Sequence, residues 1–121
     1  RQPGDMDTVQ VYDDYPVIVS MQLEDLGFCE KGQIAGFVEG NEFTTDGSLP
    51  LNTNGGQLSA GQAGAAGGFQ NMTEALRQIL HQPLGDQVPD ARQALVSGFG
   101  LVNYDRGVCT GAAVLEAGDM R

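Results

Sequence analysis

The chain has 121 residues, a length that fits one compact domain spanning residues 1–121. Hydrophobic residues make up 40% of it, which is enough for a buried core and excludes a disordered tail. The net charge is −10, because only 6 lysines and arginines oppose 16 acidic residues. This charge argues against nucleic acid as a partner and against an anionic membrane, since both would repel the chain.

The cysteines and the histidine show no spacing typical of a metal site or of a disulfide framework. Cys29 and Cys109 are expected to be small apolar fillers. His81, the only histidine, is expected on the surface near the end of a helix. With no secretory signal or long apolar run in these residues, the chain is expected in the cytoplasm without membrane insertion.

The first predicted elements are a strand and a helix joined by a short corner. Residues 8–12 alternate as in a strand, and Pro16 suits the first position of a helix that Gly27 ends. Asp14 or Tyr15 is the expected cap of that helix, and the neighbouring Asp13 is expected to complement its dipole.

The middle of the chain predicts one further strand and one further helix. Residues 28–48 read as an irregular segment with a short hairpin near residues 36–43, and residues 49–52 read as a short strand. A glycine-rich turn over residues 52–64 then leads into a helix that Pro83 closes. The apolar residues expected on its buried stripe are Phe69, Met72, Leu76, Ile79 and Leu80.

The last third predicts two strands, over residues 94–100 and 110–116, joined by a polar loop at residues 103–107. The order strand, helix, strand, helix, strand, strand predicts the α/β class. We expect a mixed sheet that is covered by helices and ends in an antiparallel hairpin.

A resemblance to a known family rests on residues 51–56, which read Leu-Asn-Thr-Asn-Gly-Gly, followed by Gly61 at the head of a glycine-rich helix. This marker resembles the C-terminal half of thiolases, and it is most similar to their lipid-transfer-protein branch, which includes the thiolase domain of sterol carrier protein x. The resemblance covers residues 9–117. It implies three α-β-α layers, with the first strand and helix of that half lying upstream of Arg1.

The chain departs from the thiolase pattern at its acid–base positions. Gln62 stands where thiolases carry the histidine of Gly-His-Pro, and glutamine cannot take up a proton near neutral pH. Residues 97–100 stand where thiolases carry Cys-x-Gly, and they contain no cysteine. Tyr12 occupies the polar position of the strand–helix corner. A phenol can hydrogen-bond a carbonyl, and it can shuttle a proton if its pKa is lowered.

In the replacement of these acid–base residues, the chain resembles a branch of thiolase-like aldolases. These enzymes shorten steroid side chains by retro-aldol cleavage of a β-hydroxyacyl-CoA. The resemblance implies Tyr12 and Tyr104 as catalytic groups, with acyl-CoA as the substrate and no metal or other cofactor. The residues expected to bind the substrate, in part through free amides of the glycine-rich turn, are Asn54, Gly55, Gly56, Gln62, Gly98 and Gly100. Structural alternatives stay open, since Tyr12 and Tyr15 can simply pack and Tyr104 can be a turn residue.

The resemblance also implies partners. Thiolase sites are assembled from two halves, so we expect an N-terminal thiolase half or another protomer against this chain, in a dimeric enzyme. The aldolase branch adds a small OB-fold acyl-CoA-binding protein. No basic cluster in this chain suits the phosphates of coenzyme A, so another segment is expected to hold them. Three other functions stay open: a non-catalytic lipid or acyl-CoA carrier, a scaffold subunit, and an acetyl-CoA acyltransferase if a nucleophilic cysteine lies upstream.

Overall fold

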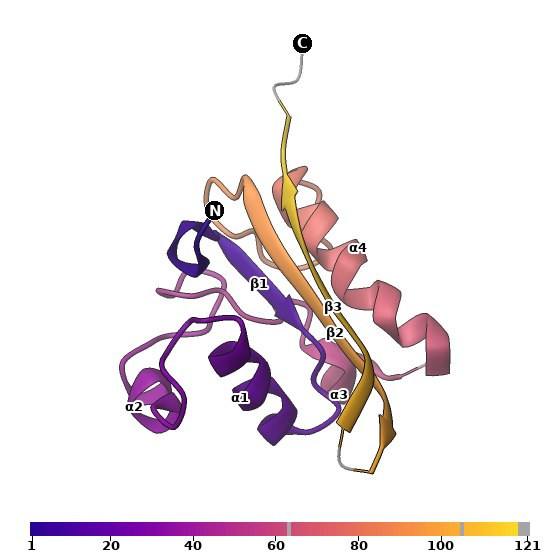
Figure 1. Cartoon of the computed structure of the whole chain (residues 1–121). Coiled ribbons are helices and arrows are strands. Elements are labelled where there is room, and N and C mark those ends of the chain that lie inside the picture. Colours follow the sequence, from indigo (N-terminus) through magenta and orange to yellow (C-terminus); the bar gives the residue numbers. More distant parts are fainter. Residues whose placement is uncertain (63, 105, 119–121) are drawn as a thin grey trace.

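Three strands form a mixed sheet with helices on both faces (Figure 1). The computed structural model describes residues 1–62, 64–104 and 106–118, so Ala63 and Asp105 of the expected turn and loop lie outside the described residues. The elements in chain order are a 3-10 helix at Pro3–Asp5, β1 (Thr8–Val11), α1 (Pro16–Asp25), α2 (Ile34–Glu39), α3 (Gly56–Ala60), a 3-10 helix at Gly64–Gly67, α4 (Gly68–Ile79), β2 (Gln93–Asn103) and β3 (Arg106–Glu116).

The sheet has the order β1-β2-β3, and the expected closing hairpin is confirmed. β1 runs parallel to β2, with Val9 opposite Leu95, whereas β2 and β3 are antiparallel. On its other side β1 forms a single parallel bridge, between Val9 and Leu51. The strand expected over residues 49–52 is therefore reduced to one bridge, which still carries the chain along the edge of β1.

Alternation along the strands divides the core into two layers, because successive side chains of a strand point to opposite faces. One cluster consists of Met6, Val9, Val11, Leu49 and Leu95, and the other of Ala75, Ile79, Ala94 and Val96. Helices α1 and α2 lie on the side of the first cluster and α4 on the side of the second (Figure 1). The expected α/β architecture, a mixed sheet covered by helices, is confirmed.

Helix α1 is attached to the sheet by one buried side chain. Pro16 occupies the first turn as expected, and the helix gives way to Gly27, whose φ of 85° favours glycine. Gln22 is 8% exposed, and its Nε2 donates to the carbonyl of Tyr12 at 2.6 Å while its Oε1 accepts from Ser97 Oγ at 2.6 Å. A single carboxamide thus joins α1 to the end of β1 and to the middle of β2.

The buried face of α4 is mostly polar, and the apolar stripe expected there is largely wrong. Ile79 is buried and Met72 packs on the core, but Phe69, Leu76 and Leu80 are 72%, 41% and 50% exposed. The polar side chains buried on this helix are Asn71, Glu74 and Gln78. The reason lies in β1, which turns buried polar side chains toward α4 and so requires hydrogen-bonding partners from the helix.

Those partners form one buried network between β1 and α4. Gln10 Nε2 donates to Thr8 Oγ1 and to Thr53 Oγ1, both at 3.0 Å. Thr53 Oγ1 donates in turn to Glu74 Oε1 at 2.6 Å, and Gln78 Nε2 donates to the same oxygen at 2.8 Å. The network determines which face of α4 turns inward, against the preference of its apolar residues.

The segment between α1 and the Leu51 bridge contains a helix, so the short hairpin expected near residues 36–43 is wrong. Phe37 of α2 lies 6.5 Å from Phe28 and 6.3 Å from Phe43, measured between ring centroids. All three rings pack against the first core cluster. Within the described ranges, no helix combines the length and the hydropathy that a membrane span requires.

The first prediction concerns Gln22. Gln22→Leu leaves the Ser97 hydroxyl and the Tyr12 carbonyl without their partner, and unsatisfied buried polar groups cost about 1–3 kcal/mol each. We expect the free energy of unfolding to fall by about 2 kcal/mol in urea titrations. Gln33→Leu, at an exposed position, is the matched control and should change it by less than about 0.5 kcal/mol. Equal losses in both variants would contradict this role.

Candidate functional site

The candidate site begins at the carboxyl end of β1, where hydrogen bonds hold the strand on both sides. The Tyr12 amide donates to the Ser97 carbonyl of β2 at 3.1 Å. The Val11 amide donates to Asn52 Oδ1 at 2.8 Å, and the Asn52 amide donates to the Val9 carbonyl at 2.9 Å. These bonds bring the glycine-rich segment that follows Asn52 beside Tyr12.

The turn after Asn52 depends on backbone conformations that most side chains avoid. Asn52 has a φ of 47°, and Gly55 and Gly56 have φ of 87° and 65°. Asn54 Oδ1 accepts the Gly56 amide at 2.8 Å. Asn52 and Asn54 therefore both hold this turn.

Asp13 has a different role from the one expected. The carboxylate does not cap α1; it accepts the Gln57 amide at 2.7 Å through Oδ1 and the Leu58 amide at 3.4 Å through Oδ2, both in α3. A Cβ at Gly56 would lie 2.0 Å from Asp13 Oδ2, so only glycine allows this approach. The sequence signal for this contact is the Gly55–Gly56 pair, but nothing local identifies the carboxylate that fills its space.

Three amides of this turn are already occupied, so Gly55, Gly56 and Gln57 do not offer the free backbone donors expected for a thioester oxygen. The Gly55 amide donates to the Asn52 carbonyl, and those of Gly56 and Gln57 donate to Asn54 and Asp13. Gly55 and Gly56 therefore shape the site through their conformation. The side chains of Tyr12, Gln62 and Asn54 are the other hydrogen-bonding groups that this corner offers to a ligand oxygen.

Tyr12 and Gln62 meet across the site. Gln62 Nε2 donates to Tyr12 Oη at 2.8 Å, although the two residues stand 50 positions apart. Burial raises the pKa of Tyr12 above that of a free phenol, and the carboxylates of Asp14 and Asp13 also raise it, against the Gln62 hydrogen bond, which lowers it. Tyr12 is thus protonated at neutral pH. Its environment favours donating a hydrogen over acting as a base, contrary to the lowered pKa that proton shuttling requires.

The two glycines of β2 flank the Tyr12 corner. Gly98 follows Ser97, whose carbonyl holds Tyr12, and it pairs with Gly111 of β3. A hollow of about 280 Å³ opens on this side, and the residues that line it include Gln22, Gly98 and Gly111. Gly100 lies two positions further along, opposite Cys109. At Gly98 the backbone of β2 therefore borders this hollow without a side chain in between.

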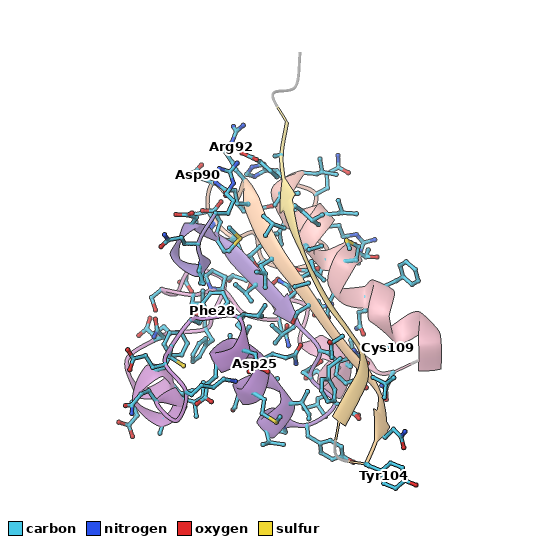
Figure 2. All side chains as sticks on the ribbon, in the orientation of Figure 1. Asp25, Phe28, Asp90, Arg92, Tyr104 and Cys109 are labelled. Carbon is cyan, nitrogen blue, oxygen red and sulfur yellow. The ribbon has the colours of Figure 1, made fainter. Side chains whose placement is uncertain are left out.

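Tyr104 lies in the turn between β2 and β3, with a φ of 48° and 91% of its surface exposed (Figure 2). Its catalytic role stays a prediction.

Tyr15 is 64% exposed, so the packing role considered for it is absent from this structure. Cys109 is exposed and is no apolar filler, whereas Cys29 is half-buried and its thiol pKa is raised by burial and by Glu24.

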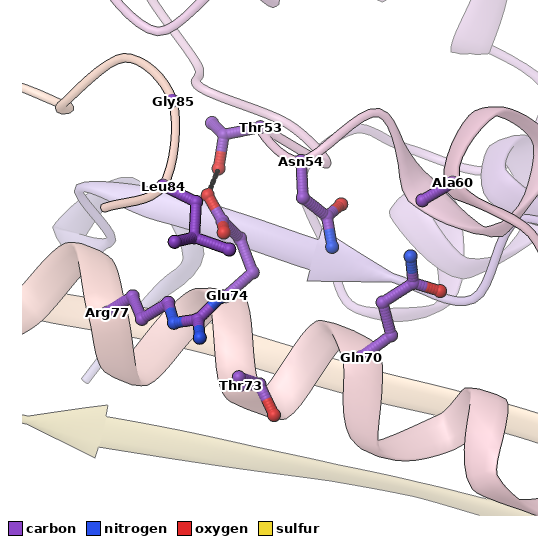
Figure 3. A pocket seen from close by; sticks show the side chains of 9 residues that line it. All are labelled: Thr53, Asn54, Ala60, Gln70, Thr73, Glu74, Arg77, Leu84 and Gly85. Carbon is purple, nitrogen blue, oxygen red and sulfur yellow. Dashed lines mark hydrogen bonds between the residues drawn. The ribbon is translucent and has the colours of Figure 1, made fainter. Parts of the chain in front are cut away.

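A second hollow, of about 470 Å³, lies between the turn and α4 (Figure 3). The residues that line it are Thr53, Asn54, Ala60, Gln70, Thr73, Glu74, Arg77, Leu84 and Gly85. Sequence reasoning missed Glu74, because a carboxylate in an amphipathic helix normally faces water. Within the described ranges, no three His, Cys, Asp or Glu side chains gather as metal ligands would.

Comparisons with known proteins show which family and fold this chain is similar to. A family model described as "Thiolase C-terminal domain-like" matches residues 1–110. The chain is 39% identical over 77 residues to the 17-hydroxy-3-oxo-4-pregnene-20-carboxyl-CoA lyase of Mycobacterium tuberculosis, covering 64% of this chain and 19% of the relative. It is 30% identical over 99 residues to human sterol carrier protein 2, covering 82% of this chain and 18% of the relative.

A solved structure shares the fold. The match to a chain of an Ltp2-ChsH2(DUF35) aldolase has a TM-score of 0.76 at 28% identity, and it covers 97% of this chain and 28% of the other. The chain thus spans less than a third of each of these proteins.

The second prediction concerns the ionisation of Tyr12. Gln62→Ala removes a hydrogen bond that favours the phenolate, so the Tyr12 pKa should rise further, whereas Asp14→Asn removes a repelling charge and should lower it. The phenolate ultraviolet band measures both, with Tyr12→Phe as the subtraction. Because folding raises this pKa, its stabilising effect is complete below the unfolded-state value and is lost as pH rises through the folded-state value. Shifts in the opposite directions would contradict the geometry.

Proposed function

The chain belongs to the thiolase C-terminal domain-like family, and from this membership we propose that it is part of an acyl-CoA lyase. The proposed reaction is retro-aldol cleavage of a β-hydroxyacyl-CoA thioester that carries a steroid side chain. The lyase of Mycobacterium tuberculosis and the Ltp2-ChsH2(DUF35) aldolase support this reaction class by their names. Since the chain spans 19% of that lyase, we assign the activity to a larger protein and expect the chain alone to be inactive.

The observation that carries the proposal is the bond between Tyr12 Oη and Gln62 Nε2. It puts a protonated phenol and a carboxamide donor together where thiolases keep an imidazole. Neither group takes up a proton at neutral pH, so the pair does not replace an imidazole in activating a nucleophilic cysteine for acyl transfer. Both can donate a hydrogen to an oxygen that gains negative charge, which a retro-aldol reaction requires.

The proposed reaction begins at the β-hydroxyl of the substrate. A base takes the proton of the β-hydroxyl, the bond between the α- and β-carbons breaks, and a ketone leaves. The electron pair of that bond passes to the thioester as an enolate. Gln62 and Asn54 offer side-chain donors to the enolate oxygen, and Tyr12 returns a proton to the α-carbon, which yields the shortened acyl-CoA. Tyr104, exposed on the hairpin turn, is our candidate for relaying the hydroxyl proton to a base elsewhere in the assembled protein.

A second function, carriage of a lipid or acyl-CoA without chemistry, is favoured by the similarity to sterol carrier protein 2. In that case the Tyr12–Gln62 pair would bind a ligand oxygen but move no proton. A scaffold subunit would likewise need the fold and not the pair. These functions are separated from the lyase by a turnover assay.

We further propose that the N-terminal thiolase half covers the outer face of α4. Phe69, Leu76 and Leu80 follow one another at helical spacing along that face, and Leu84 beyond it is 81% exposed. Several large apolar side chains exposed along one helix are typical of a surface that is buried in the assembled protein. The small share of each relative that this chain represents supports the same view.

The third prediction tests the lyase. Tyr12→Phe in the complete polypeptide, assayed with any acyl-CoA-binding partner, should lower kcat by about 100-fold or more through loss of a proton donor. Release of the ketone and of the shortened acyl-CoA measures the reaction. Tyr15→Phe, at an exposed ring, is the matched control and should retain activity. Cleavage at the parental rate by Tyr12→Phe would remove the proposed role, and no cleavage by the parent would favour a carrier.

The fourth prediction tests the α4 face. Leu76→Asp with Leu80→Asp places charges on the apolar row, and the affinity for a separately expressed N-terminal half should fall by at least about tenfold. Gln82→Asp, exposed just beyond the helix, adds a charge outside the row and is the control. Sedimentation of the mixed polypeptides measures the association. Equal binding by both variants would place the interface elsewhere.

A further inference from the structure

We propose that Asp13 is a positioning residue: it clamps α3 to the end of β1 and thereby sets the contact between Tyr12 and Gln62. The inference rests on the proposed function for its catalytic consequence. Its structural content is independent, because it concerns which bond holds the two sides of the site together.

The clamp joins segments that are distant in the sequence. Asp13 is 5% exposed, and its carboxylate accepts amides that lie 44 and 45 residues downstream, at Gln57 and Leu58. Hydrogen bonds to an ionised acceptor are stronger than neutral ones, and a buried carboxylate needs them. The absence of a side chain at Gly56 is what lets the carboxylate reach both amides.

The clamp is part of a closed ring of contacts that includes the candidate catalytic pair. Asp13 holds Gln57, and the Gln57 carbonyl accepts the Gly61 amide at 3.0 Å. Gly61 precedes Gln62, which donates to Tyr12, and Tyr12 precedes Asp13. Asp13 therefore acts on the pair through the backbone, with no need to touch a substrate.

The Gln57 side chain explains why this ring needs a strong bond. It is 5% exposed, yet neither of its amide atoms has a hydrogen-bond partner within the described part of the chain. Burying an unpaired carboxamide is unfavourable, so a conformation in which the Gln57 residue shifts toward water competes with this one, and the Gly61 amide is bonded to the same residue. The Asp13 bonds oppose that movement. Gly67 makes room for the arrangement, since a Cβ there would lie 3.1 Å from Gln57 Oε1 and 3.3 Å from Gln62 Cγ.

The first test is structural and needs no substrate. In the complete polypeptide, Asp13→Ala should speed hydrogen exchange at the Gln57 and Leu58 amides by about tenfold or more, the effect of losing a charge-assisted hydrogen bond. Asp13→Asn keeps one acceptor oxygen and should restore part of the protection. Asp14→Asn removes the neighbouring charge without touching α3, so it should leave both amides protected. Unchanged exchange in Asp13→Ala would overturn the clamp.

The second test separates positioning from general destabilisation. Asp13→Ala should lower kcat by about 100-fold with little change in KM, as misplacement of a reacting group does. If Asp13 acts through Gln62, the same substitution in a Gln62→Ala background should cost little more than Gln62→Ala alone. Fully additive losses would overturn the inference. If the parental protein cleaves no β-hydroxyacyl-CoA, the proposed function fails while hydrogen exchange still decides the clamp.

Discussion

The end of β1 is hydrogen-bonded on both sides, and the candidate site depends on that constraint. Ser97 of β2 accepts the amide of Tyr12, and Asn52 holds the amide of Val11 from the opposite side. The strand therefore cannot rotate at its last residues, and the corner that carries Tyr12 and Asp13 leaves the sheet in one direction. Gln22 adds a third connection by binding the Tyr12 carbonyl from α1. These bonds fix the backbone that carries the Tyr12 phenol.

The glycine-rich turn supports this corner mainly through its backbone conformation, because several of its amides are already hydrogen-bonded. In many enzymes the amides of such a turn face a developing oxyanion. Here the amides from Gly55 to Leu58 are held by Asn52, Asn54 and Asp13. These four amides are therefore not free for a ligand, whereas the hydroxyl of Tyr12 and the carboxamide of Gln62 meet at the same corner.

In helix α4, hydrogen bonding decides which side chains face inward, at the expense of apolar burial. Its inward face satisfies Gln10 and Thr53 through Glu74 and Gln78, while its apolar residues face outward. An isolated domain gains little from that arrangement. In the larger protein that we propose, the outer row would supply an interface by burying against the N-terminal half. The polar network and the exposed row are thus two consequences of the same helix orientation.

The sequence by itself determined the first strand, the first helix, the glycine turn and the closing hairpin, in their order. The alternation of residues 8–12, Pro16 at a helix start, the glycine turn and the closing hairpin depend on short-range preferences, and all are present in the structure. The place of Tyr12 and Gln62 in one site was also predictable, because a family resemblance relates both positions to the same ligand. Residues 36–43 were misread because a short, exposed helix has too few residues to show a period.

Only the tertiary structure decided which groups are bound to which. Asp13 reads as a helix cap from its neighbours, yet its partners lie in α3, and no local pattern reports a bond across 44 residues. The orientation of α4 depends on polar side chains of β1, which its own periodicity does not contain. The pKa of Tyr12 likewise depends on burial and on carboxylates assembled by the fold. Long-range hydrogen bonds and burial are properties of the folded arrangement, so periodicity and composition cannot supply them.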